Sequence, residues 1–145
     1  MRKGFTRLEM LSVFTLAIFL SLLIALGFEQ ARIKSYDSRR LSDVFAIKKA
    51  LELYFLDNNT YPKGFNIILG EAGARCLSKS GFQDECRKRE PIYMSRIPKS
   101  PGSDSFSYIY TSSASTNTYM LIFYLQTDMG QYRSGQRILT PDGIK

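Results

Sequence analysis

The hydrophobic pattern of this chain begins with one long apolar run near its start. The segment Met10–Phe28 contains no charged residue. A helix over this segment is about 28 Å long, close to the hydrocarbon thickness of a bilayer. The segment therefore predicts a membrane-spanning helix. A secretory signal peptide cleaved near Ala25-Leu26-Gly27 is the alternative, although its apolar region is usually shorter.

An amphipathic pattern continues the apolar run without a break. Residues 29–57 contain neither proline nor glycine, and apolar side chains recur there at helical spacing. The apolar positions are Leu41, Val44, Phe45, Ile47, Leu51, Tyr54 and Phe55. The charged positions, which fall mostly between them, are Arg39, Arg40, Asp43, Lys49 and Glu52. Turn formers at Asp57-Asn58-Asn59 mark the end. The two patterns together predict one helix over Thr6–Leu56, about 75 Å long.

The remaining residues, 58–145, predict a globular head with a small antiparallel sheet. Residues 64–90 are rich in turn signals, and Pro101-Gly102 marks the turn before the sheet. Strands are expected over Phe106–Thr111, Thr118–Thr127 and Gln136–Leu139. The middle strand is apolar on both faces, so one face is expected to cover the helix and the other to be partly exposed or to meet a neighbour. The predicted class is α+β.

Two cysteines lie close together in the head, in the segment 76–86. Because the N-terminus is of an export type, the pair Cys76 and Cys86 predicts a local disulfide in an oxidising compartment. Closing this loop would stabilise the fold by roughly 2–3 kcal/mol in the chain-entropy model. Two unpaired buried thiols are the alternative. A metal site is not expected, because the chain has no histidine and no second cysteine pair.

Composition and charge narrow the function further. Without histidine, the commonest neutral-pH acid–base catalyst is missing, and no set of nucleophile, base and orienting group can be drawn from the other residues. We therefore expect no enzyme and no cofactor. The formal net charge is +7, which becomes +5 if Arg2 and Lys3 are removed. This charge keeps nucleic acid open as a partner, although solvation of one face is the plainer interpretation.

The first ten residues, MRKGFTRLEM, contain a short basic leader, a glycine, and Phe-Thr-x-x-Glu opening the apolar helix. This arrangement resembles the processing motif of type IV prepilins and type II secretion pseudopilins. The resemblance implies that residues 1–4 are a leader, and that a prepilin peptidase cuts between Gly4 and Phe5 and methylates the new amine of Phe5. Residues 5–28 would then form the transmembrane and filament-core helix.

Glu9 would be the fifth residue of the mature chain. A carboxylate at the edge of a spanning helix is costly to insert and is a functional hypothesis by default. The family resemblance implies that Glu9 pairs with the Phe5 amine of a neighbouring subunit and sets the register between copies. Arg7 stands where the family usually has an apolar residue. It could pair with Glu9 within the same chain and compete with that amine.

Two further segments are similar to the same family. AIKKALELYFLDNNTYP resembles the helix end of major pseudopilins and of many major pilins, and YMSRIPKSP resembles the entry to the family's sheet. The resemblance, closest to major pseudopilins, implies a pilin fold. Some related pseudopilins hold calcium in the loops of this sheet. Here the available carboxylates are Asp104, Asp128 and Asp142, and because they are scattered, a solvated turn role is favoured over calcium binding for each of them.

The function implied is that of a structural subunit. Copies would wait as single-pass inner-membrane proteins, with the N-terminus in the cytoplasm and the head periplasmic or extracellular. After cleavage by the prepilin peptidase, an inner-membrane platform and its ATPase would assemble them into a type IV pilus-like or type II secretion filament made of copies of this chain. The alternative is a monomeric binding module, either membrane-anchored or secreted, that forms no filament.

Overall fold

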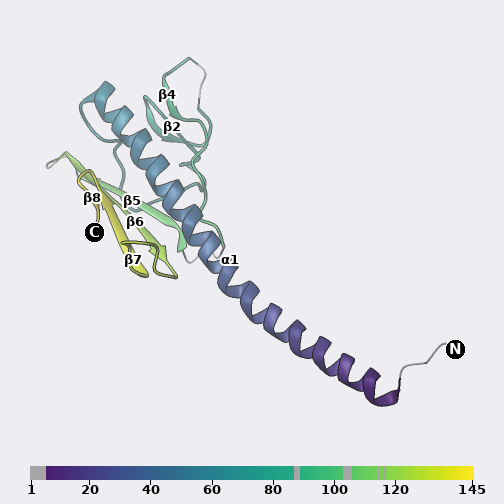
Figure 1. Cartoon of the computed structure of the whole chain (residues 1–145). Coiled ribbons are helices and arrows are strands. Elements are labelled where there is room, and N and C mark those ends of the chain that lie inside the picture. The colour runs from purple at the N-terminus through teal and green to yellow at the C-terminus, as the bar shows by residue number, and fades with distance from the viewer. Residues whose placement is uncertain (1–5, 87–88, 103–105, 114, 116) are drawn as a thin grey trace.

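One helix dominates the molecule. The computed structural model describes residues 6–86, 89–102, 106–113, 115 and 117–145. Helix α1 (Arg7–Asn58) is 52 residues long, or about 78 Å at the ideal rise. Its first half projects away from the rest of the molecule, and its second half lies between two groups of strands (Figure 1). The prediction of a single long helix that packs with its second half is confirmed.

Local side chains define both ends of α1. Thr6 has extended backbone (φ −72°, ψ 154°), and its hydroxyl accepts a hydrogen bond from the amide of Glu9, as an N-cap does. At the other end, Asn59 is left-handed (φ 54°), and its amide donates to the carbonyl of Phe55 at 2.8 Å. Asparagine tolerates this conformation better than most residues do. The helix therefore ends within the predicted turn-forming stretch.

A five-stranded antiparallel sheet in the order β1-β5-β6-β7-β8 covers one side of α1. Its strands are β1 (Ile67–Leu69), β5 (Tyr108–Ser113), β6 (Thr118–Leu125), β7 (Gly135–Thr140) and β8 (Gly143–Ile144). Tyr119, Leu121, Phe123 and Leu125 on the inner face of β6 are buried, whereas Met120 on its outer face is 44% exposed. The prediction of two unlike apolar faces on this strand is confirmed.

A second antiparallel sheet, in the order β3-β2-β4, lies on the other side of α1. It consists of β2 (Cys76–Ser78), β3 (Gly81–Gln83) and β4 (Ile92–Met94). This sheet was not predicted, because strands of three residues are too short to show an alternating pattern. The disulfide between Cys76 and Cys86 joins β2 to the segment after β3, with the two Cα atoms 6.0 Å apart.

The ends of two predicted strands shift. The strand expected from Phe106 begins at Tyr108, and the strand expected to reach Thr127 ends at Leu125. The second shift has a clear cause. The amides of Gln126 and Thr127 donate to the carboxylate of Asp37 on α1 and are therefore taken out of the sheet ladder.

The core lies between the second half of α1 and the two sheets. The helix contributes Val44, Ile47, Leu51 and Tyr54, each at most 9% exposed, and none of the described side chains in the first half of the helix belongs to the core. The remaining core side chains come from the strands and their loops, and include Leu69, Leu77, Tyr108, Leu121 and Leu139. The head is thus built around one half of the helix and leaves the other half free.

Candidate assembly helix and neck

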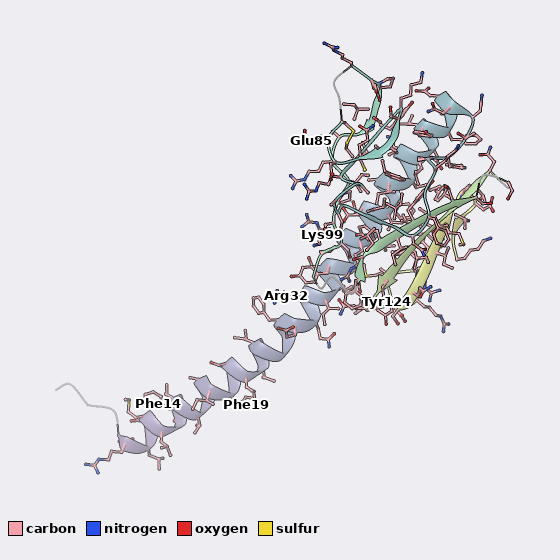
Figure 2. The ribbon with its side chains drawn as sticks, turned by 180° about the vertical axis from the view of Figure 1, so that it is seen from behind. Phe14, Phe19, Arg32, Glu85, Lys99 and Tyr124 are labelled. Carbon is pink, nitrogen blue, oxygen red and sulfur yellow. A yellow bond between two sulfur atoms is a disulfide. The ribbon has the colours of Figure 1, made fainter. Side chains whose placement is uncertain are left out.

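The first half of α1 exposes apolar side chains on every side. From Leu8 to Phe28, the large apolar side chains that the structure describes are 48–79% exposed. Figure 2 shows Phe14 and Phe19 on this bare part of the helix. An 18-residue window of the helix has a mean hydropathy of 2.5 and is 0% buried. By length and composition the helix can cross a membrane, and its apolar surface requires lipid or other helices around it.

The few hydroxyl groups in this half are satisfied by the helix itself. Ser12 donates to the carbonyl of Glu9 at 2.8 Å, and Ser21 donates to that of Ala17 at 2.8 Å. Thr15 donates to the carbonyls of Leu11 and Ser12. Unpaired polar groups are expensive in hydrocarbon. These bonds therefore suit the segment to an environment without water.

The carboxylate of Glu9 lies at the beginning of the helix and bonds to Thr6. The amide and the hydroxyl of Thr6 donate to Oε2 of Glu9 at 2.7 and 2.9 Å, and the amide of Glu9 donates back to the Thr6 hydroxyl at 3.3 Å. This reciprocal arrangement is a capping box. The negative charge also interacts favourably with the positive end of the helix dipole.

The other residues expected at this end stand as follows. Gly4 and Phe5, where cleavage and methylation are expected, lie outside the described residues. Arg7 is exposed and, within the part of the chain that the structure describes, forms no ion pair with Glu9. The sequence analysis singled out Glu9 but missed Thr6. The spacing Thr-x-x-Glu before an apolar run is the signal that indicates a capping box.

A buried ion pair lies within α1, at the place where the bare helix meets the head. Nη1 of Arg40 lies 2.6 Å from Oδ1 of Asp37, and both side chains are 0% exposed. We call Asp37, Arg40, Ser100, Gln126 and Thr127 the neck cluster. Charged residues are almost never fully buried unless they are paired. The two buried charges are therefore stabilised by each other and by the other residues of the neck cluster.

Asp37 holds the end of β6. Its carboxylate accepts hydrogen bonds from the amide of Gln126 at 3.0 and 3.1 Å, from the amide of Thr127 at 2.7 Å and from the hydroxyl of Thr127 at 2.8 Å. Hydrogen bonds to a charged acceptor are roughly twice as strong as neutral ones. Asp37 thus fixes the exit of the central strand to the helix.

Arg40 holds the loop that leads into β5. It donates to the hydroxyl of Ser100 at 3.2 Å, to the carbonyl of Pro101 at 2.7 Å and to the side-chain carbonyl of Gln126 at 3.3 Å. Its guanidinium carbon lies 4.8 Å from the ring centroid of Phe106, within the range of a cation–π interaction. The guanidinium group therefore links the helix to two loops at once.

The placement of Arg40 corrects the sequence analysis. There Arg40 belonged to the charged positions between the apolar ones, which suggested a solvated face. It is buried instead because its partners come from segments 60 to 86 residues further along the chain. A pattern confined to the helix cannot reveal such partners. The only local signal is the spacing of Asp37 and Arg40, which suits an ion pair on one helix face.

The three carboxylates considered for calcium binding do not form a common site among the described residues. Asp128 accepts a hydrogen bond from the amide of Ser134 at 2.7 Å, which lowers the pKa of Asp128 and closes the turn between β6 and β7. Asp142 is exposed, and Asp104 lies outside the described residues. Among the residues that the structure describes, no group of three or more His, Cys, Asp or Glu is placed to hold a metal ion.

Comparison with known proteins finds several relatives that carry the same name. No family model matches the chain, and no match was found among solved structures. Type II secretion system core protein G of Vibrio cholerae is 30% identical over 112 residues, which cover 75% of this chain and 73% of that protein. The protein of the same name from Aeromonas hydrophila is 26% identical over 74% of this chain and 73% of its own length. That of Pectobacterium carotovorum is 31% identical over 71% and 64%.

A long helix that projects from a head with an antiparallel sheet, apolar where it is free and amphipathic where it is packed, is the pilin fold. The molecule is thus a pilin-like protein. Given the similarity to the Vibrio cholerae protein over about three quarters of both chains, it belongs to the family of type II secretion system core protein G, the pseudopilins. The pseudopilin family that the sequence resemblance indicated is confirmed.

Proposed function

We propose that this protein is a structural subunit of a type II secretion pseudopilus, in which copies pack through the first halves of their α1 helices. The observation that carries the proposal is the apolar half of α1, which is exposed on all sides in a chain whose relatives are named as core proteins of that secretion system. Before assembly, lipid surrounds this surface. In the filament, the same surface of other copies replaces the lipid. A type IV pilus would use the same helix, but the named relatives favour secretion.

The capping box supports a role for Glu9 in assembly. Thr6 engages Oε2 of Glu9, while no described residue donates to Oε1. In this proposal that oxygen accepts a hydrogen bond from the amine of Phe5 on a neighbouring subunit. The amine exists only after a prepilin peptidase removes residues 1–4 by cutting between Gly4 and Phe5, and it is then methylated. In a filament interior of low dielectric, such a pair is strong enough to define the register between copies.

The subunit carries out no chemistry of its own in this proposal. It is a substrate of the prepilin peptidase, and an assembly platform and its ATPase at the inner membrane move it into the filament. The N-terminus faces the cytoplasm, and the head faces the periplasm. Lifting the subunit pulls along α1, and the neck cluster and the core transmit this force to the head. A monomeric binding module with the same fold would need neither Glu9 nor a free Phe5 amine.

Replacement of Glu9 by Leu tests the proposal. We expect the variant to enter the membrane and to keep the thermal stability of its head, because the side chain of Glu9 hydrogen-bonds only to Thr6 among the described residues. We also expect filament yield, counted by electron microscopy in cells that contain the assembly machinery, to fall at least tenfold. Glu29→Gln is the matched control, because it removes an exposed carboxylate of the same helix beyond the apolar run.

The intact mass of the same samples separates processing from assembly. Wild type and both variants should begin at a methylated Phe5. Normal filaments from the Glu9→Leu variant would remove the role assigned to Glu9. A mature chain that still begins at Met1, or that begins near Phe28, would favour the binding module instead.

A further inference from the structure

The stretch of α1 between its apolar half and the head carries unbalanced positive charge. Three exposed cations lie there, Arg32, Lys34 and Arg39, which we call the neck cations. Asp37 and Arg40 neutralise each other in the interior. Glu29 is the only other carboxylate between residues 29 and 40, so three cations face one anion and the net exposed charge is +2. Figure 2 shows Arg32 on the bare helix between Phe19 and the head.

The position of these cations matches the surface of a bilayer. If the hydrocarbon ends at Phe28, Arg32 lies about 6 Å beyond it along the axis, Lys34 about 9 Å and Arg39 about 16 Å. The headgroup layer extends about 6 Å beyond the hydrocarbon, and the Debye length is about 8 Å at physiological salt. Side chains on a helix also tilt towards its N-terminus. Arg32 and Lys34 therefore reach the headgroup phosphates, and Arg39 lies at the edge of that range.

The side chain of Arg32 is already oriented for an anion. Its Nε donates to the hydroxyl of Tyr36 at 3.0 Å, and its guanidinium carbon lies 5.5 Å from the centroid of that ring. No described residue accepts a hydrogen bond from its two terminal nitrogens. A planar guanidinium held in this way presents a fork that suits a phosphate. Tyr36 also belongs to a residue type that is enriched at membrane–water interfaces.

The neck cations lie on the side of the membrane to which the head is translocated, where positive charge is least expected. Cations just beyond a spanning helix oppose the translocation of the adjoining segment across the bilayer. On the N-terminal side, once residues 1–4 are removed, the side chains of Arg7 and Glu9 cancel and the new amine of Phe5 leaves a charge of about +1, which is below the +2 of the neck. From this imbalance and from the geometry of Arg32, we propose that the neck cations bind the headgroup phosphates of anionic phospholipids in the leaflet on the side of the head. This inference rests on the proposed function, because it needs the subunit to be stored in a membrane. Lipid binding of this kind holds the neck against the bilayer until the subunit is lifted out.

Other anionic partners fit this surface less well. A second copy of this chain has a net charge of the same sign. Arg39 also lines a groove of about 850 Å³ in the head, whose other charged lining residues are Arg75, Asp84, Arg96 and Lys99. Because the cations outnumber the acid there, the positive field continues away from the membrane. That extension is where nucleic acid would bind. It leaves out Arg32 and Lys34, which lie beside the bilayer.

Native mass spectrometry of the full mature chain tests the inference. The protein is held in a neutral detergent with equal amounts of phosphatidylglycerol and phosphatidylcholine of the same acyl chains. We expect the wild type to retain the anionic lipid about tenfold or more over the neutral one, because each cation near a surface contributes about fivefold. The triple variant Arg32→Gln, Lys34→Gln, Arg39→Gln should retain the two lipids equally.

The matched control removes the same charge elsewhere. Lys49→Gln, Lys63→Gln, Lys79→Gln changes three exposed cations on the packed half of α1 and on the head, and it should keep the wild-type preference. Equal retention by the wild type, or an equal loss in the control, would overturn the inference. So would removal of the preference by millimolar inorganic phosphate, which would assign the cations to a soluble anion. A third outcome would also overturn it: the wild type shows no lipid preference but binds duplex DNA, and the triple variant alone loses that binding. The neck cations would then be assigned to nucleic acid.

Flotation with vesicles of phosphatidylcholine alone separates this inference from the proposed function. A chain that floats with neutral vesicles but shows no preference for the anionic lipid contradicts the lipid-binding role and leaves the membrane-stored subunit intact. A chain that does not float with any vesicle contradicts the membrane-stored subunit itself.

Discussion

The two halves of α1 differ in where they find their partners. Leu16 in the first half is 60% exposed, whereas Leu51 in the second half is 0% exposed. The backbone is the same continuous helix, and both residues are leucines. The second half is packed by the sheets of its own chain, and the first half has no partner within the described residues of that chain. The helix is thus a folded scaffold at one end and an incomplete interface at the other.

The neck cluster marks the boundary between the two halves. Below it lies the bare helix with Arg32 and Lys34, and above it begins the core with Val44. Hydrophobic packing holds the head against α1 over most of its length, whereas at the neck cluster polar contacts hold it. A buried ion pair is not a strong source of stability in general. Here it satisfies the amides at the end of β6 and the carbonyl of Pro101, which would otherwise be left unpaired.

The largest effect is expected from Arg40→Met. This change leaves Asp37 buried without its counter-charge, so the free energy of unfolding should fall by about 3–5 kcal/mol. The melting temperature, measured by circular dichroism in detergent, should drop by roughly 12 °C or more. Arg39→Met is the control, because Arg39 is exposed and its loss should change the free energy by less than about 0.5 kcal/mol. Similar losses in both variants would mean that the buried pair does not secure the neck.

The contrast between the two halves can be measured with one substitution made twice. Leu51→Ala removes buried contacts and should lower the free energy of unfolding by about 2–5 kcal/mol. Leu16→Ala, made on the exposed half, should leave the melting temperature of the head unchanged within error. Chemical denaturation in detergent gives both values. A clear loss of head stability in Leu16→Ala would show that the first half of α1 supports the head after all.

The smallest effect concerns a half-buried acid on the packed half. Burial raises the pKa of Asp43 above its usual range, although a hydrogen bond from the hydroxyl of Tyr108 at 3.0 Å opposes this shift. The unfolded chain therefore ionises first as pH rises. Relative to Asp43→Asn, the wild type should lose stability from about pH 4 up through the raised pKa. Solvent screening limits the difference to about 0.5 kcal/mol or less.

Asp128 provides a control of opposite sign. Its pKa is lowered by the hydrogen bond from the amide of Ser134. The stability that the wild type has over Asp128→Asn should therefore be present above the ordinary aspartate pKa and be lost as pH falls through the lowered one. Denaturation curves recorded over a pH series decide both signs. The same sign for the two variants would contradict the assigned surroundings of Asp43.

Much of the fold could be predicted because its signals are local. The helix follows from apolar spacing and from turn formers at Asn58 and Asn59, and β6 follows from its alternation of inner and outer residues. The two cysteines lie close enough in sequence to suggest their disulfide. The second sheet escaped because β2, β3 and β4 have three residues each and show no period.

The candidate site divides in the same way. Glu9 is marked by its place at the start of an apolar run, and Thr6 follows from the capping spacing once that rule is applied. The burial of Arg40 was not marked in the sequence beyond its spacing from Asp37, because the hydroxyl of Ser100 and the carbonyl of Pro101 reach it only through the fold. The pairing of Arg32 with Tyr36, four residues apart on the helix, lies between these cases.

The sequence by itself determined the length of α1, the division of that helix into an apolar and an amphipathic half, and the family of the protein. These features rest on periodicity and on motifs within a few residues, where geometry is known in advance. Only the tertiary structure decided that Asp37 and Arg40 are buried and that a second sheet covers the helix. Each depends on which distant segments come together, and a charged side chain is solvated or buried according to what the fold brings against it.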